Sequence, residues 1–298
     1  MGYRRQSQIC IRERMYTYQK RKEKMTMKVS KMFGGLALVA SVFLLTACGS
    51  GNQKDTSVSD IKDKGTLVVA MNPEFAPFEF KTLVDGKDTI VGADVEITKA
   101  IGEELGVKVK FSSMSFNNVL ASLQSGKADV AISGISATPE RKKAYNFSEA
   151  YYESENVVLI KKTDVDKYTK TSSLAGLSVG TQKGSIQENV ASEQLKGSKV
   201  VALTQNGEMI NELKNGQIQA VVLEKPIAEG YAANNDDLTI ANIKLKNDDA
   251  DAYAVALPKG DDKLTKEVNK VIKDLKDSGK IDQFVQEAYA LSTSESSN

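Results

Sequence analysis

The sequence of 298 residues contains no histidine, no tryptophan and only two cysteines, Cys10 and Cys48. Without histidine, the chain cannot form the Ser–His or Cys–His pairs that activate a nucleophile, nor the usual zinc sites. Residues 49–298 contain no thiol, so they have no disulfide framework. Chemistry based on carboxylates or lysines is not excluded, and no cofactor is indicated.

Residues 48–298 also lack an excess of basic side chains. Ten of the 40 Lys and Arg residues lie in residues 1–47, whereas only two of the 39 Asp and Glu residues lie there. The remainder therefore carries seven more acidic than basic side chains. An acidic body argues against nucleic acid as the partner, and its length allows one large core or two smaller ones.

The N-terminal region lacks an apolar run long enough to span a membrane. Met32–Ala47 carries no charge and follows Lys31, but it is shorter than the roughly 20 residues of a membrane-spanning helix. A basic start, an apolar run and small residues predict a secretory signal peptide in residues 1–47. Residues 1–26 are basic and patternless, so we expect them to result from a misassigned start, with translation beginning near Met27.

The signal peptide ends in Leu45-Thr46-Ala47-Cys48-Gly49. This run resembles the bacterial lipobox, in which the cysteine receives a diacylglyceryl group and palmitate and becomes the mature N-terminus. The alternative is an ordinary buried cysteine at the end of a core helix. Residues 48–64 are rich in Ser, Asp, Lys and Gly, which predicts a flexible tether behind a lipid anchor.

Strands and helices alternate in the first part of the body. Ile97, Ile101 and Leu105 recur at spacing four before Gly106, which predicts an amphipathic helix over 94–105. The apolar and turn patterns predict the other elements: strands at 66–71, 78–84, 89–91, 107–111 and 128–132, a turn at 85–87 and a helix at 117–125. This alternation predicts an α/β unit with a largely parallel sheet.

A second alternating unit follows. Its predicted strands and helices are strands at 156–161, 178–181, 199–203 and 220–223, and helices at 207–215 and 225–234. Ser185-Ile186-Gln187-Glu188 matches a capping box, which predicts a further helix start. Beyond it we expect a strand at 252–257 and helices at 261–278 and 281–290.

One loop combines features of an anion site. Ser133–Arg141 follows a predicted strand, and Thr138 with Pro139 is a typical helix start. An arginine in the first helical turn is unfavourable unless an anion meets it, because the helix N-terminus is already positive. Backbone donors, Ser136 and Arg141 could therefore hold a carboxylate. The alternative is a surface arginine beside an ordinary capped helix.

Several polar or aromatic residues come directly after predicted strands. They are Phe75, the 133–141 loop, Gln182–Ser185 and Glu224. Ligands of open α/β sheets bind outside the carboxyl ends of the strands. These loops from two units therefore predict one cleft between them.

Together, a set of segments resembles the family 3 extracellular solute-binding proteins of amino-acid import systems. The segments are 72–80 (NPEFAPFEF), 91–95 (VGADV), 123–129 (LQSGKAD), 133–141 (SGISATPER), and 146–148 (NFS) with Tyr151 and Tyr152. The resemblance covers Thr66 to Ala290 and implies a periplasmic-binding-protein type II fold.

In that fold two α/β lobes, joined by two crossing strands, close on one amino acid. The resemblance implies a first lobe of residues 65–154 and 251–291 and a second lobe of residues 155–250. It places the crossings near 153–156 and 248–251. Residues 292–298 are expected to be a disordered tail.

The resemblance also implies a ligand site. Arg141 would hold the ligand α-carboxylate with Ser136, and Ser185 would donate to it from the other lobe. Ser133 and Gly134 would offer backbone groups, with the Gly134 carbonyl facing the α-ammonium. Phe75 and Phe116 would form walls, although both phenylalanines could simply be core residues. The complete expected set is Asn72, Phe75, Phe116, Ser133, Gly134, Ser136, Arg141, Gln182, Ser185 and Glu224.

Two positions depart from the pattern of the family. Glu224 stands where many members have the aspartate that pairs with the α-ammonium, and it is one methylene longer. Asn72 stands where some binders of cationic amino acids have aspartate. The amino-acid sequence around residues 75–84 and 111–117 is most similar to that of arginine-binding lipoproteins of streptococcal type. Arginine is therefore favoured as the ligand, and glutamine comes next.

The sequence thus predicts a binding protein and not an enzyme. It would be a monomeric lipoprotein on the outer face of the membrane of a Gram-positive bacterium, serving the permease and ATPase of an ABC importer. The main alternative is a dehydratase on the same fold, with Glu224 as general acid. A signalling sensor would need a membrane-spanning segment and an output domain, and the sequence shows neither after Ala290.

Overall fold

The computed structural model describes residues 57–248 and 251–294. The predicted signal peptide, Cys48, the start of the tether and the last four residues lie outside this part of the chain. Within it, no helix is long and apolar enough to cross a membrane.

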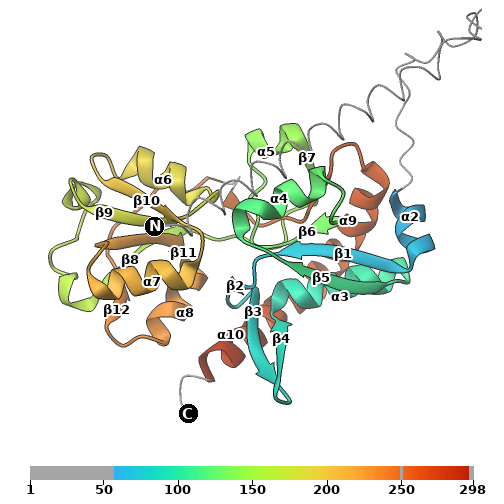
Figure 1. Ribbon diagram of the computed structural model, residues 1–298, viewed down its shortest axis with the longest axis horizontal. Coiled ribbons are helices and arrows are strands. Elements are labelled where there is room, and N and C mark those ends of the chain that lie inside the picture. Colours follow the sequence, from blue (N-terminus) through green and yellow to red (C-terminus); the bar gives the residue numbers. More distant parts are fainter. Residues whose placement is uncertain (1–56, 249–250, 295–298) are drawn as a thin grey trace, which may run out of the picture. The chain divides into compact units, whose positions relative to one another are not determined.

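The first half of the described chain and a strand from near its end build a five-stranded sheet in the order β5-β1-β6-β13-β7 (Figure 1). Its strands are β1 (Thr66–Met71), β5 (Lys108–Ser113), β6 (Val130–Ala131), β7 (Tyr145–Phe147) and β13 (Ala256–Pro258). β1 runs parallel to β5 and β6, whereas β13 is antiparallel to both β6 and β7. We call this sheet and its helices the first lobe.

A second five-stranded sheet has the order β10-β9-β11-β8-β12. Its strands are β8 (Asn156–Lys161), β9 (Ser178–Gln182), β10 (Lys199–Leu203), β11 (Ala220–Glu224) and β12 (Leu238–Ile240). β9 is parallel to β10 and β11, and β8 is antiparallel to β11 and β12. We call this sheet and its helices the second lobe.

The prediction of largely parallel sheets is therefore right for only part of each sheet. β8 and β13 each follow a connection between the lobes, without the helical crossover that joins parallel neighbours. No crossover therefore requires these strands to run parallel to the others. β8 pairs antiparallel with β11 and β12, and β13 pairs antiparallel with β6 and β7.

The helices also divide between the lobes (Figure 1). Those of the first lobe are α2 (Ser57–Lys64), α3 (Ala93–Leu105), α4 (Phe116–Gln124), α5 (Pro139–Ala144), α9 (Asp262–Asp277) and α10 (Lys280–Ser294). Those of the second are α6 (Gln187–Gln194), α7 (Asn206–Asn215) and α8 (Lys225–Ala233), with 3-10 turns η1 (Lys162–Asp164) and η2 (Thr171–Leu174). Gly106 ends α3 with a left-handed φ of 71°, as the sequence predicts.

A small third sheet lies beside the first lobe, formed by β2 (Glu74–Phe75), β3 (Glu79–Val84) and β4 (Lys87–Val91). The predicted turn is confirmed: Asp85 and Gly86 have φ angles of 51° and 73°. Positive φ at both central residues is what a two-residue hairpin turn requires.

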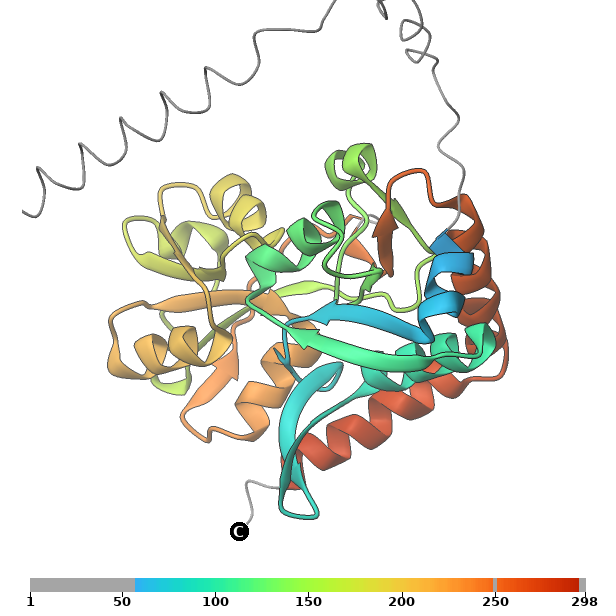
Figure 2. The same ribbon diagram turned by 45° about the vertical axis from the view of Figure 1, so that its right-hand side comes forward.

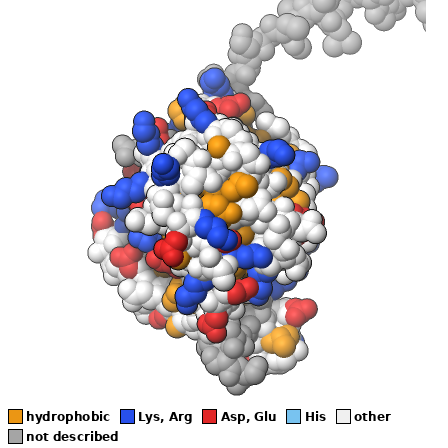
Figure 3. All heavy atoms as spheres, turned by 90° about the vertical axis from the view of Figure 1, so that its left-hand side faces the viewer, with side chains coloured by type: hydrophobic (Ala, Val, Ile, Leu, Met, Phe, Trp, Pro, Cys, Tyr) orange, Lys and Arg blue, Asp and Glu red, His pale blue; other side chains and the backbone are white. Residues whose placement is uncertain are grey.

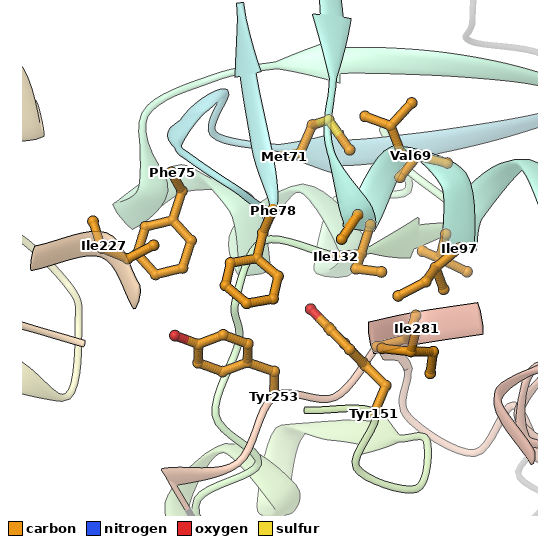
Figure 4. Close-up of a cluster of buried hydrophobic side chains, with 14 of the residues drawn as sticks. Val69, Met71, Phe75, Phe78, Ile97, Ile132, Tyr151, Ile227, Tyr253 and Ile281 are labelled. Carbon is orange, nitrogen blue, oxygen red and sulfur yellow. The ribbon is translucent and has the colours of Figure 1, made fainter. Parts of the chain in front are cut away.

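Two segments connect the lobes, at 148–155 and 241–255, and they include the predicted crossings. They meet at Tyr152 and Tyr253, where Tyr253 N donates to Tyr152 O at 2.8 Å. The Tyr253 ring also meets the edge of Phe78 with 5.0 Å between ring centroids, beside Phe75 (Figure 4). Aromatic packing therefore holds the connection against the first lobe. The predicted lobe limits themselves stay a prediction.

The structure corrects both ends of the body. Ser57–Lys64, predicted as part of the tether, is helix α2, because Ile61 is only 1% exposed and packs in the core. α2 contacts α9 and β1 (Figure 2). At the other end α10 continues to Ser294, so residues 292–294 of the expected tail are helical.

Candidate functional site

A cavity lined by residues of both lobes has a volume of about 10 Å³. It is lined by Phe75, Phe116, Gly134, Ser136, Arg141, Gln182, Ser185, Ile186, Gln187 and Glu224. Eight of the ten residues that the sequence predicts for the site are among them. This volume is far below the roughly 300–1,000 Å³ of most ligand pockets, so the lobes must move apart before an amino acid can enter.

Arg141 is positioned by the helix start that the sequence predicts. Thr138 caps α5, and its Oγ1 accepts from Arg141 N at 3.2 Å. The Arg141 guanidinium then donates to Ser136 O at 2.9 Å and, across the cleft, to Gly184 O at 3.1 Å. Its Cζ lies 5.9 Å from the centre of the Phe116 ring, within cation–π range. Burial lowers the pKa of Arg141 from its usual value, while the Glu224 carboxyl opposes this shift.

The predicted capping box at Ser185 does not form. α6 begins at Gln187, and the residue before it, Ile186, already has helical angles and makes no side-chain cap. Glu188 instead accepts from the backbone N–H of Gly184. The Ser185 Oγ atom is left buried and finds no hydrogen-bond partner among the described residues. Such a buried hydroxyl costs about 1–3 kcal/mol, which a ligand in the cavity could recover.

Glu224 is the last residue of β11 and is only 7% exposed. Its Oε1 accepts from Gln187 Nε2 at 2.8 Å, and the same Nε2 donates to Asn156 Oδ1 at 2.7 Å. Burial raises the pKa of Glu224 from 4.5 to about 7, and the negative charge of Asp251 adds to this, against the hydrogen bond from Gln187 and the charge of Arg141. The carboxyl is thus poised to change its charge near neutral pH.

Asn72 and Ser133, the other two predicted residues, lie just behind the cavity and do not line it. Gln182 Nε2 of the second lobe donates to Asn72 Oδ1 at 2.9 Å. The backbone N–H of Asn72 donates to Ser133 Oγ at 3.0 Å. Asn72 therefore links the two lobes, and Ser133 holds Asn72 in place next to the cavity lining.

Gly134 lies against the Phe75 ring. Its φ of 53° is left-handed, and a Cβ placed on it would lie 2.4 Å from Phe75 Cε1. Only glycine fits both the backbone angle and the contact. Figure 4 shows Phe75 beside Ile227 and Phe78, so this wall of the cavity is continuous with the core.

Two lining residues, Ile186 and Gln187, were not predicted from the sequence. Both follow Ser185 directly, at the start of α6. The capping-box motif concealed them, because it predicts a solvent-facing helix start. Gln187 carried one signal that could have revealed it: a polar side chain in the first helical turn, where the strand ends converge.

The cavity therefore offers a guanidinium, an unpartnered hydroxyl and a buried carboxyl between two aromatic rings. A cation and an acid that face the same small cavity can bind the carboxylate and the ammonium of a zwitterion. Away from the cavity, the face shown in Figure 3 carries acidic and basic side chains interspersed, with no field of one sign.

Comparison with known proteins agrees with this geometry. The family model of bacterial extracellular solute-binding proteins, family 3, matches residues 67–290. The arginine-binding extracellular protein ArtP of Bacillus subtilis is 35% identical over 253 residues, which cover 84% of this chain and 94% of ArtP.

Solved structures agree as well. The amino acid ABC transporter substrate-binding protein AbpA of Streptococcus pneumoniae, in complex with L-arginine, is 50% identical with a TM-score of 0.77, covering 79% of this chain and 99% of that one. An ancestral amino-acid-binding protein, a precursor of cyclohexadienyl dehydratase, is 31% identical with a TM-score of 0.71, covering 78% and 99%.

Proposed function

Since the chain belongs to the bacterial extracellular solute-binding proteins of family 3, we propose that it captures a polar amino acid, L-arginine in the first place, and delivers it to the permease of an ABC importer. The observation that carries the proposal is the cavity between Arg141 and Glu224. The arginine complex of the 50% identical relative supports arginine as the ligand. Glutamine comes next.

We assign the ligand α-carboxylate to Arg141. A guanidinium binds a carboxylate with two parallel hydrogen bonds, and here two backbone carbonyls occupy its donors, Ser136 O and Gly184 O. On binding, the carboxylate would take over donors from these carbonyls. Ser185 would add its unpartnered hydroxyl from the second lobe, so the carboxylate would link the two lobes.

We assign the α-ammonium to Glu224. Its carboxyl lines the same cavity, and an ammonium placed against it would favour its ionised form and lower its raised pKa. Phe75 and Phe116 would then flank the ligand side chain, and Asn72 and Gln182 would hold the lobes together behind it.

The alternative function is a dehydratase on the same fold. It is favoured by the likeness to the precursor of cyclohexadienyl dehydratase and by the pKa of about 7 at Glu224, which suits a general acid. Incubation of the purified protein with prephenate or arogenate tests it. Formation of an aromatic product that stops in the Glu224→Gln variant would support the enzyme.

We also propose that Cys48 is lipidated and that the mature protein is a monomer anchored on the outer face of the cell membrane of a Gram-positive bacterium. The Leu45–Cys48 run supports this. Mass spectrometry of protein extracted from membranes tests it: a diacylglyceryl group on Cys48 is expected. An unmodified chain that retains residues 1–47 would refute it.

The ligand can be identified by a thermal-shift screen of the twenty amino acids with ornithine, citrulline and cystine. A ligand at a hundredfold excess over its Kd stabilises the folded state by about 2.7 kcal/mol. L-Arginine should give the largest shift in melting temperature. If no amino acid changes the melting temperature, while titration calorimetry also shows no heat, the proposed function is wrong.

A further inference from the structure

Two fully buried carboxyl groups lie behind the cavity, in the first lobe. Glu79 begins β3 and Asp94 lies in the first turn of α3, and both side chains are 0% exposed. Neither residue lines the cavity. Two carboxylates cannot both be charged in a dry interior without a large cost, so the pair needs an explanation.

The donors around the pair leave one oxygen of each carboxyl without a partner. Glu79 Oε1 accepts from Ser133 Oγ at 2.5 Å. Asp94 Oδ2 accepts from the backbone N–H of Gly134 at 3.3 Å and from the Tyr151 hydroxyl at 3.0 Å. The remaining oxygens, Glu79 Oε2 and Asp94 Oδ1, are buried and receive no donor from the described residues, and each carboxyl lies close enough to act on the pKa of the other.

A hydrogen bond between two carboxyl groups requires one proton, because a carboxylate only accepts. Asp94 is the better site for the charge, since it accepts two donors and lies at the positive N-terminus of the 13-residue helix α3. Glu79 is then the neutral acid that donates to Asp94. In agreement, the pKa of Glu79 is raised well above its usual value, first by burial and then by the charge of Asp94, whereas burial raises the pKa of Asp94 only to about 6.

The pair holds two consecutive residues of the loop that lines the cavity. Glu79 binds the side chain of Ser133, and Asp94 binds the backbone N–H of Gly134. The peptide between them is trans, so its carbonyl points opposite to its N–H. Asp94 therefore turns the Ser133 carbonyl away from the interior of the lobe, toward the side on which Gly134 lines the cavity.

We propose that Glu79 and Asp94 are a positioning pair that shares one proton, carried by Glu79, and fixes the Ser133–Gly134 peptide so that its carbonyl can meet the ligand α-ammonium. This inference rests on the proposed function for its ligand. The pair does not touch the ligand itself and acts through the loop.

Amide substitutions test the shared proton. In Glu79→Gln the amide keeps every bond: Gln Nε2 donates to Asp94, and Gln Oε1 still accepts from Ser133. Its affinity for L-arginine should stay within about twofold of the wild type. In Asp94→Asn the amide must donate to Glu79, which forces the charge onto the less favourable residue, so affinity should fall and should recover partly at higher pH, as Glu79 ionises.

The double variant Glu79→Gln, Asp94→Asn cannot satisfy the same bonds. Either two NH2 groups face each other, or one NH2 faces the N–H of Gly134, or it takes the place of the acceptor of the Ser133 or Tyr151 hydroxyl, whose proton then has no partner. Its affinity should fall at least tenfold below the product of the two single effects. Glu96→Gln, an amide substitution in the same helix at an exposed ion pair with Lys99, is the matched control and should change nothing.

A spectroscopic measurement keeps the test independent of ligand and of folding in the double variant. At neutral pH without ligand, the infrared difference spectrum of wild type minus Glu79→Gln should contain a carboxylic-acid carbonyl band, because the contribution of Glu224 cancels. A missing band, or a Glu79→Gln variant that loses as much affinity as the double variant, would overturn the shared proton. If the wild type binds no amino acid while the band is present, the proposed function fails and the proton pair stands.

Discussion

At the scale of single residues, Arg141 is the side chain on which ligand affinity should depend most. It is the cation of the cavity, and a buried carboxylate needs a paired charge. Arg141→Ala should weaken L-arginine binding by about 2–5 kcal/mol or more, whereas the exposed neighbour Lys142→Ala should have no effect. Titration calorimetry measures both. Undiminished affinity in Arg141→Ala with a normal melting curve would remove Arg141 from the site.

Glu224 should make ligand affinity depend on pH. Its pKa of about 7 in the free protein means that the carboxyl becomes neutral below this pH. If the ionised form pairs with the α-ammonium, affinity should fall about tenfold per pH unit below 7. In Glu224→Gln this slope should vanish, and arginine and the best neutral ligand should be weakened alike. A loss confined to arginine would instead assign Glu224 to the ligand side chain.

The same substitution should stabilise the free protein at high pH. Between pH 4.5 and about 7, the folded state keeps a proton on Glu224 that the unfolded state has released. The free energy of unfolding therefore falls as the pH rises through this window, and this loss is complete above 7. Glu224→Gln lacks the ionisation, so its melting temperature should exceed that of the wild type at pH 8 and match it below 4.5. Equal melting temperatures at pH 8 would contradict the buried charge.

Sequence patterns predicted the site residues that follow strand ends, but not the buried residues that hold the cavity loop without lining the cavity. Arg141 and Glu224 could be found because a loop or helix start follows a strand directly. Glu79 and Asp94 could not, since a carboxyl in an apolar strand or in a first helical turn is usually solvated, and only the fold brings the two together. Ser185 was predicted to cap helix α6, yet the Glu188 side chain binds the backbone N–H of Gly184 instead. The Ser185 hydroxyl is left without a partner among the described residues, in the lining of the cavity.

At the scale of elements, α2 shows how one apolar residue changes a segment. Its composition predicts a tether, but Ile61 anchors it in the core of the first lobe. Ile61→Ala should reduce the free energy of unfolding by about 2–5 kcal/mol. The exposed neighbour Lys62→Ala should change it by less than about 0.5 kcal/mol. Urea denaturation compares them, and equal stability of the two variants would show that α2 does not belong to the folded body.

Strand boundaries were predicted better than strand directions. β8 and β10 lie at the predicted residues, because their apolar runs are bounded by polar and turn residues. β6 and β13 are shorter than predicted, since residues beside them turn into the cavity loop and the connection between lobes. The antiparallel direction of β8 and β13 could not be read from local patterns, because it depends on where the chain crosses.

At the scale of the whole molecule, ligand affinity includes the free energy of bringing the lobes together. The cavity is too small to admit an amino acid as it stands, so every binding event begins from more separated lobes. Contacts between lobes that do not touch the ligand then contribute to affinity through the closed state. Glu74 with Asn206 is one such contact.

The contact of Glu74 with Asn206 isolates this closing contribution. Glu74 lies in β2 and does not line the cavity, yet its Oε2 accepts from the N–H of Asn206 at 3.2 Å, at the positive start of α7. Its backbone O also accepts from Asn206 Nδ2 at 3.2 Å. Glu74→Ala removes only the side-chain bond, which is worth about 0.5–1.5 kcal/mol.

L-Arginine affinity should therefore fall about two- to tenfold in Glu74→Ala, through faster release, while the melting temperature of the free protein stays constant. Glu74→Gln, which keeps an acceptor, should lose less. Glu208→Ala is the matched control, because Glu208 is exposed in the first turn of the same helix and makes no hydrogen bond or ion pair with Glu74 in the described part of the chain. An equal loss in Glu208→Ala would assign the effect to the charge of the helix start, and an unchanged release rate in Glu74→Ala would show that this contact forms without favouring closure.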